Sequence, residues 1–361
     1  MSQRIISYRR ILVVKLRYHG DMLLTTPLIS TLKANYPDAK IDVLLYQDTM
    51  PILSANPEIH QLYGLKRKTA TSLEKIKDFA AIRKTLKKNN YDLIVNLADQ
   101  WPIALLVKSL GCHSIALNRG DNLKGKIWRS FFSTCVSAKG THIVEQNRSV
   151  LSPLNLQPTA QRDRMSLYYR EEDTDRMFSI SPQLREQAYI VIQPTARQSF
   201  KCWDNDKFAT VIDDLKVRGI EVVLTCGPSQ DDLHVVQDIH ALCTHKPNIT
   251  FAGKTSFLEL AALIDRAQLY LGVDSAPMHM AAALDTPVVC LFGPTDHRKW
   301  RPWTDHSIVI WAGDYQPMPD RKYLDRNQKY LSCIPPQDVI QAVNRLLAER
   351  HSRWRETRNR Q

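Results

Sequence analysis

The stretch Arg10-Ile-Leu-Val-Val-Lys-Leu16, followed by the turn Arg17-Tyr-His-Gly-Asp21, decides the fold class. Its first part is a short and nearly continuous apolar run, which is typical of a strand buried on both faces of a parallel sheet. A helix is expected from Met22 to Asn35 and a second strand over Ile41-Asp-Val-Leu-Leu-Tyr46, so these elements form one βαβ unit. We therefore expect an α/β fold.

The same rhythm continues along the chain and restarts in its second half. Further strands are expected at residues 91–97, 114–117, 189–193, 220–225, 269–273 and 287–292. Helices are expected at residues 207–218, 233–244, 257–265, 278–284 and 337–350. The alternation predicts two doubly wound, Rossmann-like domains of the GT-B type, which face a central cleft at the carboxyl ends of their strands.

The domain boundary is expected in the polar, proline-punctuated stretch between Ser152 and Gln187. We assign residues 1–175 to an N-terminal, acceptor-binding domain and residues 176–335 to a C-terminal domain that binds a nucleotide sugar. Residues 336–361 are expected to form a helix and a basic tail, with the helix packing back on the N-terminal domain. A chain of 361 residues suits two such domains.

The composition favours a protein of the cytoplasm. Hydrophobic residues make up 43% and charged residues 24% of the chain, as in ordinary globular proteins. No apolar run reaches the length needed to cross a bilayer, and the N-terminus lacks the layout of a signal peptide. The seven cysteines are scattered without a C-x-x-C pair, which indicates reduced thiols.

The net charge of +12 indicates anionic partners. Nucleic acid, a phosphorylated glycolipid and an acidic membrane surface all fit this charge. The basic residues gather at Leu65–Lys68, Lys75–Lys88 and Arg345–Arg360, where solvated helix faces explain them equally well. No recognition helix, zinc finger or aromatic RNA-binding pattern is present, so no nucleic acid partner is expected.

The segment Leu271-Gly-Val-Asp-Ser-Ala-Pro-Met-His-Met-Ala-Ala-Ala283 is the strongest candidate for an anion site. It takes a strand through a turn of small residues into an alanine-rich helix. The free N–H groups and partial positive charge of such a helix start can hold a diphosphate. An ordinary helix capped by Asp274 or Ser275 is the alternative. Another tight turn, Leu291-Phe-Gly-Pro-Thr-Asp296, ends the next strand at the same sheet edge and favours the anion site.

Two further loops supply candidate chemistry. Asp21 lies directly after the first strand, where a carboxylate can take a proton from an acceptor hydroxyl, or can merely cap the following helix. In the loop Gln193–Trp203, Arg197 and Lys201 can neutralise phosphate charge.

No metal or cofactor is expected. Asp204-Asn-Asp206 has the D-x-D form of many metal-dependent glycosyltransferases, but it precedes a helix, and helix capping explains it better. The sequence has no P-loop, and no G-x-G-x-x-G follows either opening strand.

Together these pieces resemble the bacterial lipopolysaccharide heptosyltransferases, the ADP-heptose-dependent glycosyltransferase family 9. The resemblance runs along nearly the whole chain. It is carried by Gly20-Asp21, Lys201-Cys-Trp203, Gly253-Lys-Thr-Ser256, the Asp274 segment and Phe292-Gly-Pro-Thr295. The residues are most similar to the branch that adds a third, branching heptose to the second heptose of the inner core.

The resemblance implies roles for individual residues. Asp21 matches the family's catalytic base. The residues implied in donor binding are Thr195, Arg197, Lys201, Asp231, Lys254, Thr255, Asp274, Ser275, Ala276 and His279. Among them, Lys254 and Thr255 match the segment that lines the adenine, and Asp231 is the candidate for the ribose contact. The candidates for acceptor binding are Arg17, His19, Asp99, Gln100 and Arg119.

The implied reaction is metal-independent and inverting. ADP-L-glycero-β-D-manno-heptose is the expected donor and phosphorylated inner-core lipopolysaccharide the expected acceptor. The enzyme is expected in the cytoplasm, held electrostatically at the inner leaflet of the inner membrane by residues 4–10 or 66–88. A nucleotide-sugar epimerase of the same architecture and a non-catalytic nucleic-acid-binding protein are the alternatives.

Overall fold

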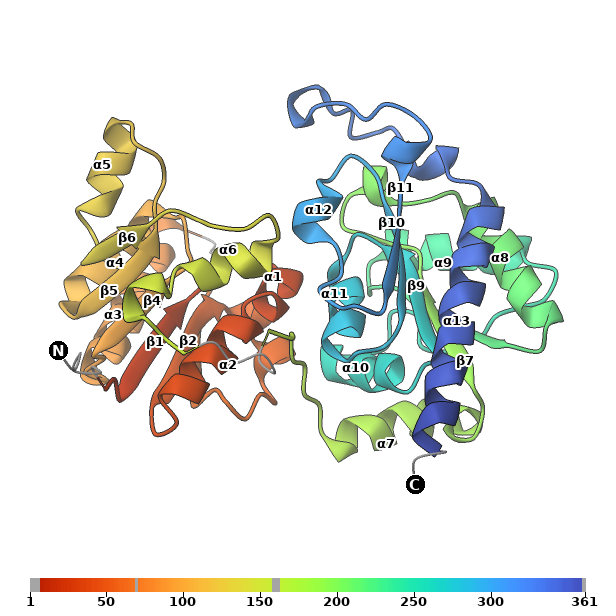
Figure 1. Cartoon of the computed structure of the whole chain (residues 1–361), viewed down its shortest axis with the longest axis horizontal. Helices are drawn as coiled ribbons and strands as arrows, with labels where there is room; N and C mark the ends of the chain where they lie inside the picture. The colour runs from red at the N-terminus through yellow and green to blue at the C-terminus, as the bar shows by residue number, and fades with distance from the viewer. Residues whose placement is uncertain (1–6, 69–70, 158–162, 359–361) are drawn as a thin grey trace. The chain divides into compact units, whose positions relative to one another are not determined.

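The structure, a computed structural model, describes residues 7–68, 71–157 and 163–358 (Figure 1). Arg4 and the end of the basic tail beyond Arg358 lie outside the described residues. The chain divides into two compact units, one ending at Ser166 and the other beginning at Leu167. Both units are α/β, as expected from the alternation of apolar strands and helices.

The first unit contains a parallel sheet of six strands in the order β3-β2-β1-β4-β5-β6. The strands are β1 (Arg10–Val14), β2 (Lys40–Tyr46), β3 (Gln61–Leu65), β4 (Leu93–Asn96), β5 (His113–Leu117) and β6 (Thr134–Val136). In this order, the strands that follow β1 along the chain build the sheet outward first on one side and then on the other.

Helices cover this sheet. They are α1 (His19–Leu23), α2 (Thr26–Asn35), α3 (Ser72–Lys88), α4 (Trp101–Leu110), α5 (Leu123–Arg129) and α6 (Ile143–Ser149), with 3₁₀ turns at Gln47–Leu53 and Ser152–Leu154. The single helix expected from Met22 to Asn35 is wrong, because α1 ends before Thr25 and α2 starts anew. Pro27 lies in the first turn of α2, where its missing N–H costs no hydrogen bond.

The second unit contains a parallel sheet of five strands in the order β11-β10-β9-β7-β8. The strands are β7 (Tyr189–Gln193), β8 (Glu221–Leu224), β9 (Leu269–Val273), β10 (Val288–Phe292) and β11 (Ser307–Trp311). The central strands β7, β9 and β10 are buried at every position, which explains their unbroken apolar sequences.

The helices of the second unit are α7 (Glu171–Ile180), α8 (Asn205–Val217), α9 (Gln230–Leu242), α10 (Phe257–Asp265), α11 (Ala276–Ala283), α12 (His297–Trp300) and α13 (Pro336–Arg358). Short 3₁₀ turns lie at Pro182–Arg185, Ser199–Lys201, Ala312–Asp314, Arg321–Tyr323 and Tyr330–Cys333. No helix among the described residues is long and apolar enough to cross a membrane.

The unit boundary differs from the expected one at residues 175 and 176. That position falls inside α7, which packs against α10 and so belongs to the second unit. The last helix, α13, also belongs there, because Val339, Val343 and Leu346 join the core that α8 and the strands form. Its apolar face is therefore covered by the second unit, whereas the sequence led us to expect packing on the first.

Candidate active site

In each unit, several of the residues singled out from sequence lie where the strand order reverses. In the second unit this point lies between β7 and β9, because the chain continues from β7 to one side and from β9 to the other. In open α/β sheets, ligands bind beyond the carboxyl ends of the strands at this switch point. The Gln193–Trp203 loop leaves β7 here, and the Asp274 segment leaves β9.

An ion pair joins these two segments. The Lys201 Nζ lies 2.6 Å from the Oδ2 of Asp274. Only 24% of the Lys201 side chain and 9% of the Asp274 side chain are exposed. Charges this buried persist only when they are paired. Two candidates 73 residues apart in sequence therefore meet at the switch point.

The start of α11 is open in the way a diphosphate site requires. Ser275 occupies the N-cap position, but its side chain makes no capping hydrogen bond within the described structure. Capping by Ser275, part of the alternative considered from sequence, is therefore absent. Ser275 instead adjoins the hydroxyl of the fully buried Tyr270, whose pKa is raised by burial. The first N–H groups of α11 are thus not occupied by a capping side chain.

Gly272 allows this arrangement. A Cβ at Gly272 would lie 2.4 Å from the hydroxyl of Tyr270. Glycine at this position therefore leaves room for the Tyr270 ring. Farther along α11, His279 is buried and lies one turn after the N-cap, as expected. Ala276 is the first residue of the helix.

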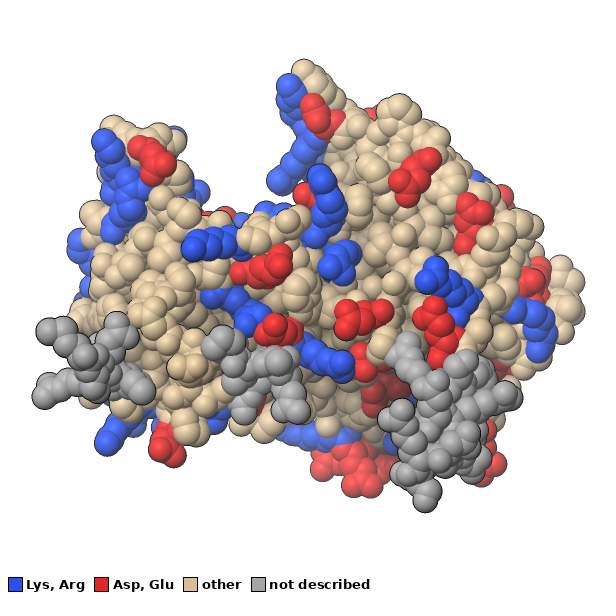
Figure 2. Space-filling view, in the orientation of Figure 1, with Lys and Arg blue, Asp and Glu red and all other residues tan. Residues whose placement is uncertain are grey.

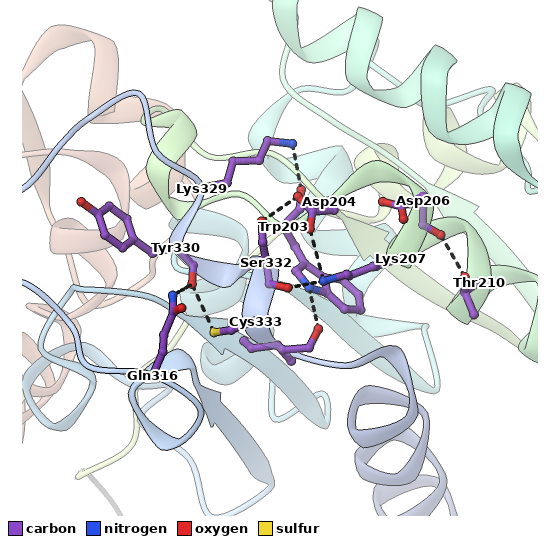
Figure 3. A network of polar contacts seen from close by, with 11 residues as sticks. Trp203, Asp204, Asp206, Lys207, Thr210, Gln316, Lys329, Tyr330, Ser332 and Cys333 are labelled. Atoms are coloured by element: carbon purple, nitrogen blue, oxygen red, sulfur yellow. Dashed lines mark hydrogen bonds and ion pairs between the residues drawn. The ribbon is translucent and has the colours of Figure 1, made fainter.

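A network of polar contacts holds the loop that carries Lys201 (Figure 3). The Trp203 indole donates to the carbonyl of Ile334 at 3.2 Å, and the Lys329 Nζ donates to the carbonyl of Trp203 at 3.3 Å. Thr195 is buried at the other end of the loop, while Arg197 is exposed. The chain near residue 330 thus fixes the position from which Lys201 reaches Asp274.

The same network explains Asp204-Asn-Asp206. Asp204 stands at the N-cap of α8 without a side-chain capping bond, so the expected capping role is wrong. Its carboxylate accepts from the Ser332 hydroxyl at 2.8 Å and pairs with the Lys207 Nζ at 3.3 Å. Among the described residues, no group of three histidine, cysteine or acidic side chains is placed to hold a metal ion.

Two turns come together beside the switch point. Gly253, with φ of +68°, donates from its N–H to the carbonyl of Cys226 at 3.2 Å, so Lys254 and Thr255 follow it next to the Gly227 turn. The candidate Asp231 is exposed in the first turn of α9.

Its neighbour Asp232 faces the Gly227 turn instead. The Asp232 Oδ2 would lie 2.7 Å from a Cβ at Gly227. Adjacent residues of a helix point about 100° apart, so Asp231 and Asp232 face different directions. Sequence reasoning chose Asp231 and missed Asp232.

The strand β10 ends in a third turn at this edge. Gly293 lies against the backbone of Phe200 in the Lys201 loop. Beyond it is an open cavity of about 560 Å³, whose lining includes Thr295, His297, Trp311 and Asp314. The ring centroids of His297 and Trp311 lie 4.6 Å apart with the rings tilted by 36°, and burial lowers the pKa of His297. The cavity offers aromatic surface and polar groups of both signs, which suits a sugar.

In the first unit, the switch point lies between β1 and β4, and Asp21 follows β1 there. The Asp21 Oδ2 accepts from the backbone N–H of Tyr18 at 3.3 Å, so the capping interaction considered from sequence is present. The carboxylate is half-buried at the start of α1. It lies just beyond the carboxyl end of β1, beside the switch point of this sheet.

The acceptor candidates in the loops after β1, β4 and β5 contact one another. Arg17 pairs with the carboxylate of Asp99, and the Arg119 Nη1 donates to the carbonyl of Asp99 at 2.6 Å. Gln100 donates to the carbonyl of Leu16 at 3.1 Å. His19 instead contacts the carbonyl of Asp48 at 2.9 Å, and burial lowers its pKa.

Arg67 lies beside these acceptor candidates, but the sequence analysis did not name it as a site residue. Its guanidinium pairs with Asp48 at 2.8 Å and donates to the carbonyl of Arg17 at 2.8 Å. It lies over the rings of Tyr18 and Tyr46, 4.5 Å and 4.1 Å from their centroids. The basic stretch Leu65–Lys68 marked it only as surface charge, because its partners come from distant parts of the chain.

Comparisons with known proteins agree with this geometry. The profile of glycosyltransferase family 9 (heptosyltransferase) matches residues 79–331. Lipopolysaccharide heptosyltransferase 3 of Escherichia coli K12 is 56% identical over 335 residues, which cover 92% of this chain and 97% of that protein.

Solved structures share the fold over almost the full length. A family 9 glycosyl transferase from Veillonella parvula has a TM-score of 0.83 at 24% identity and covers 96% of this chain and 99% of its own. The E. coli heptosyltransferase WaaC, solved with ADP, has a TM-score of 0.72 at 19% identity and covers 93% and 99%.

More distant structures share the fold alone. The UDP-GlcNAc 2-epimerase of Methanocaldococcus jannaschii has a TM-score of 0.50 at 13% identity, covering 93% of this chain and 99% of its own. The epimerase alternative therefore has no support beyond architecture.

Proposed function

The chain belongs to glycosyltransferase family 9, the heptosyltransferases, and we propose that it transfers L-glycero-D-manno-heptose from ADP-heptose to a heptose of the lipopolysaccharide inner core. The sugar added is the third, branching heptose. The similarity to a lipopolysaccharide heptosyltransferase 3 supports this acceptor. The observation that carries the donor assignment is the Lys201–Asp274 pair beside the uncapped start of α11.

The donor diphosphate binds at the start of α11. The backbone N–H groups after Ser275 donate to the phosphate oxygens, and the Lys201 ammonium adds charge. The adenine lies against Lys254 and Thr255, and Asp232, together with or in place of Asp231, accepts from the ribose hydroxyls. WaaC was solved with ADP, which supports an adenine nucleotide here.

Asp21 is the general base for an inverting displacement. The acceptor hydroxyl loses its proton to the Asp21 carboxylate as its oxygen attacks the anomeric carbon. The bond to the diphosphate breaks on the opposite face, so the configuration inverts. Charge grows on ADP as it leaves, and fixed N–H dipoles with Lys201 stabilise it.

No metal ion has a part in this scheme. Lys201 and the helix start supply the positive charge that a divalent ion provides in D-x-D enzymes, while Asp204 already holds Lys207 and Ser332. Acceptor recognition is assigned to Arg17, Asp99, Gln100 and Arg119, with His19 beside them. Binding of a phosphorylated acceptor fits the arginines of this set.

One experiment tests the function. The protein is incubated with ADP-heptose, with chelator present, and with lipopolysaccharide cores truncated after the first or the second heptose. We expect heptose transfer only to the core with two heptoses, with the new linkage on the second. ADP-heptose consumption without an acceptor would instead indicate an epimerase or hydrolase. Transfer that stops in chelator and returns with a metal ion would contradict the metal-independent mechanism.

A further inference from the structure

Leucine and isoleucine side chains of α5 point away from the first unit. Leu123 is 72% exposed and Ile127 is 46% exposed, although both are large and apolar. They are four residues apart and so lie on one side of the helix. The opposite side is fixed, because Trp128 is buried and donates to the carbonyl of Leu117 at 3.0 Å. The exposed side of α5 is therefore held rigidly outward.

Gly125 allows α5 to pack closely against the turn that precedes it. A Cβ at Gly125 would lie 1.9 Å from the carbonyl oxygen of Gly120, so the helix sits directly on the preceding turn. The Asn122 side chain accepts from the Gly125 N–H at 2.9 Å and caps the helix. The outward direction of the apolar side chains follows from these contacts.

Exposed apolar side chains also lie on α4, which meets α5 through the rings of Trp101 and Trp128. Trp101 and Leu105 are 37% and 57% exposed and lie one turn apart. The Trp101 ring meets those of Trp128 and Phe131, with centroids 5.4 Å and 6.1 Å away. We call Trp101, Leu105, Leu123 and Ile127 the apolar strip.

Basic side chains border the apolar strip. On α5, Lys124 and Lys126 are exposed and lie on either side of Leu123 and Ile127 at 100° per residue. On α4, Lys108 lies over the Phe131 ring. Residues 101–132 contain the basic residues Lys108, Arg119, Lys124, Lys126 and Arg129 and the single acidic residue Asp121. Figure 2 shows basic side chains gathered where α5 projects.

We propose that the apolar strip and its lysines dock the first unit on an anionic phospholipid surface. Apolar side chains flanked by lysines are what an interfacial helix presents to a bilayer, with the ammonium groups at the phosphates. This deepens the proposed function, because its acceptor is carried by a membrane lipid. The strip also adjoins the reaction site, since Arg119 lies over Trp101 and donates to Asp99, which pairs with Arg17.

The test compares two exposed apolar pairs. The variant Leu123→Glu with Ile127→Glu alters the strip. The comparison variant, Leu73→Glu with Ile76→Glu, alters residues of α3 that are 61% and 65% exposed. These residues lie in the stretch 66–88 that was expected from sequence as an electrostatic anchor, so the two variants also separate that expectation from the apolar strip. Vesicles of phosphatidylethanolamine with phosphatidylglycerol, and vesicles without the anionic lipid, are sedimented with each protein.

We expect the α5 variant to bind anionic vesicles on the order of tenfold or more weakly than wild type, and the α3 variant to bind like wild type. Lys124→Ala with Lys126→Ala should weaken binding only to the anionic vesicles, and added salt should do the same. Equal binding by the wild type and the α5 variant would overturn the proposal. Wild-type self-association that the α5 variant abolishes, without any vesicle effect, would also overturn it and assign the strip to a second copy.

Transfer to two forms of the acceptor separates this proposal from the function itself. The α5 variant should act normally on a water-soluble, deacylated acceptor and poorly on the same core embedded in vesicles. If the wild-type enzyme transfers to neither form, the proposed function fails, whatever the vesicle binding shows.

Discussion

The two switch points of the molecule hold their charged residues in different ways. In the second unit, Lys201 and Asp274 are largely buried and a polar network fixes the loop between β7 and α8. In the first unit, Arg17 and Asp99 are 45% and 46% exposed, and arginines join the loops. Burial makes the proposed donor side, in the second unit, rigid, whereas solvent weakens the contacts of the proposed acceptor side in the first unit. A constant nucleotide suits the first arrangement, and a large glycolipid that must enter and leave suits the second.

The sharpest test of the acceptor side is Asp21→Ala. We predict that transfer falls by about 10²–10⁴, the contribution of a general base, while ADP affinity stays unchanged because the proposed donor site lies in the second unit. Initial rates with saturating donor, together with calorimetric titration of ADP, measure both quantities. Near-wild-type turnover would leave Asp21 as nothing more than the partner of the Tyr18 N–H.

On the donor side, Lys201→Met should weaken ADP binding by about 10–100-fold, as expected for a lost charge-assisted contact. The loss leaves the buried Asp274 unpaired, so adding Asp274→Asn should restore part of the lost stability without restoring ADP affinity.

Lys216→Met is the matched control for Lys201→Met. Lys216 pairs with Glu221 at 2.8 Å, and the two side chains are about as buried as those of Lys201 and Asp274. Glu221 is the first residue of β8, however, and so lies at the amino ends of the strands, away from the switch-point loops. We expect a comparable loss of stability and unchanged ADP affinity. Equal ADP affinities in the two lysine variants would show that the switch point is not the donor site.

The packing behind the donor site gives a smaller effect. Gly272→Ala places a Cβ against the Tyr270 hydroxyl, and overpacking of this kind costs about 1–3 kcal/mol. Because Tyr270 adjoins Ser275, ADP affinity should fall together with the midpoint of thermal unfolding. If the midpoint drops and ADP binds as before, Tyr270 does not support the start of α11.

The strands that could be predicted from sequence are those buried on both faces. The runs at Tyr189–Gln193 and Leu269–Val273 match the observed strands to the residue. The strands at Gln61–Leu65, Thr134–Val136 and Ser307–Trp311 were missed. All three are edge strands and only partly buried, although Ser307–Trp311 is an apolar run that its sequence could have predicted.

The site divides in the same manner. Residues next to predicted strand ends, such as Lys201 and Asp274, could be found because parallel strands all deliver their loops to one edge. Arg67 and Asp232 could not, because their place depends on side-chain direction and on partners distant in sequence. The sequence around Asp21 likewise does not distinguish a helix cap from a catalytic base, because a carboxylate at this position can serve as either.

The smallest predicted effect concerns the Arg17–Asp99 pair. Exposed pairs contribute about 0.2–1 kcal/mol, so Asp99→Asn should hardly change the unfolding free energy, and a double-mutant cycle with Arg17→Met should give a coupling that vanishes in high salt. The KM for the acceptor should nevertheless change, because Asp99 also fixes the direction of Arg17. A coupling of several kcal/mol that survives salt would mean that the acceptor side is as rigid as the donor side, and the contrast between the two switch points would fail.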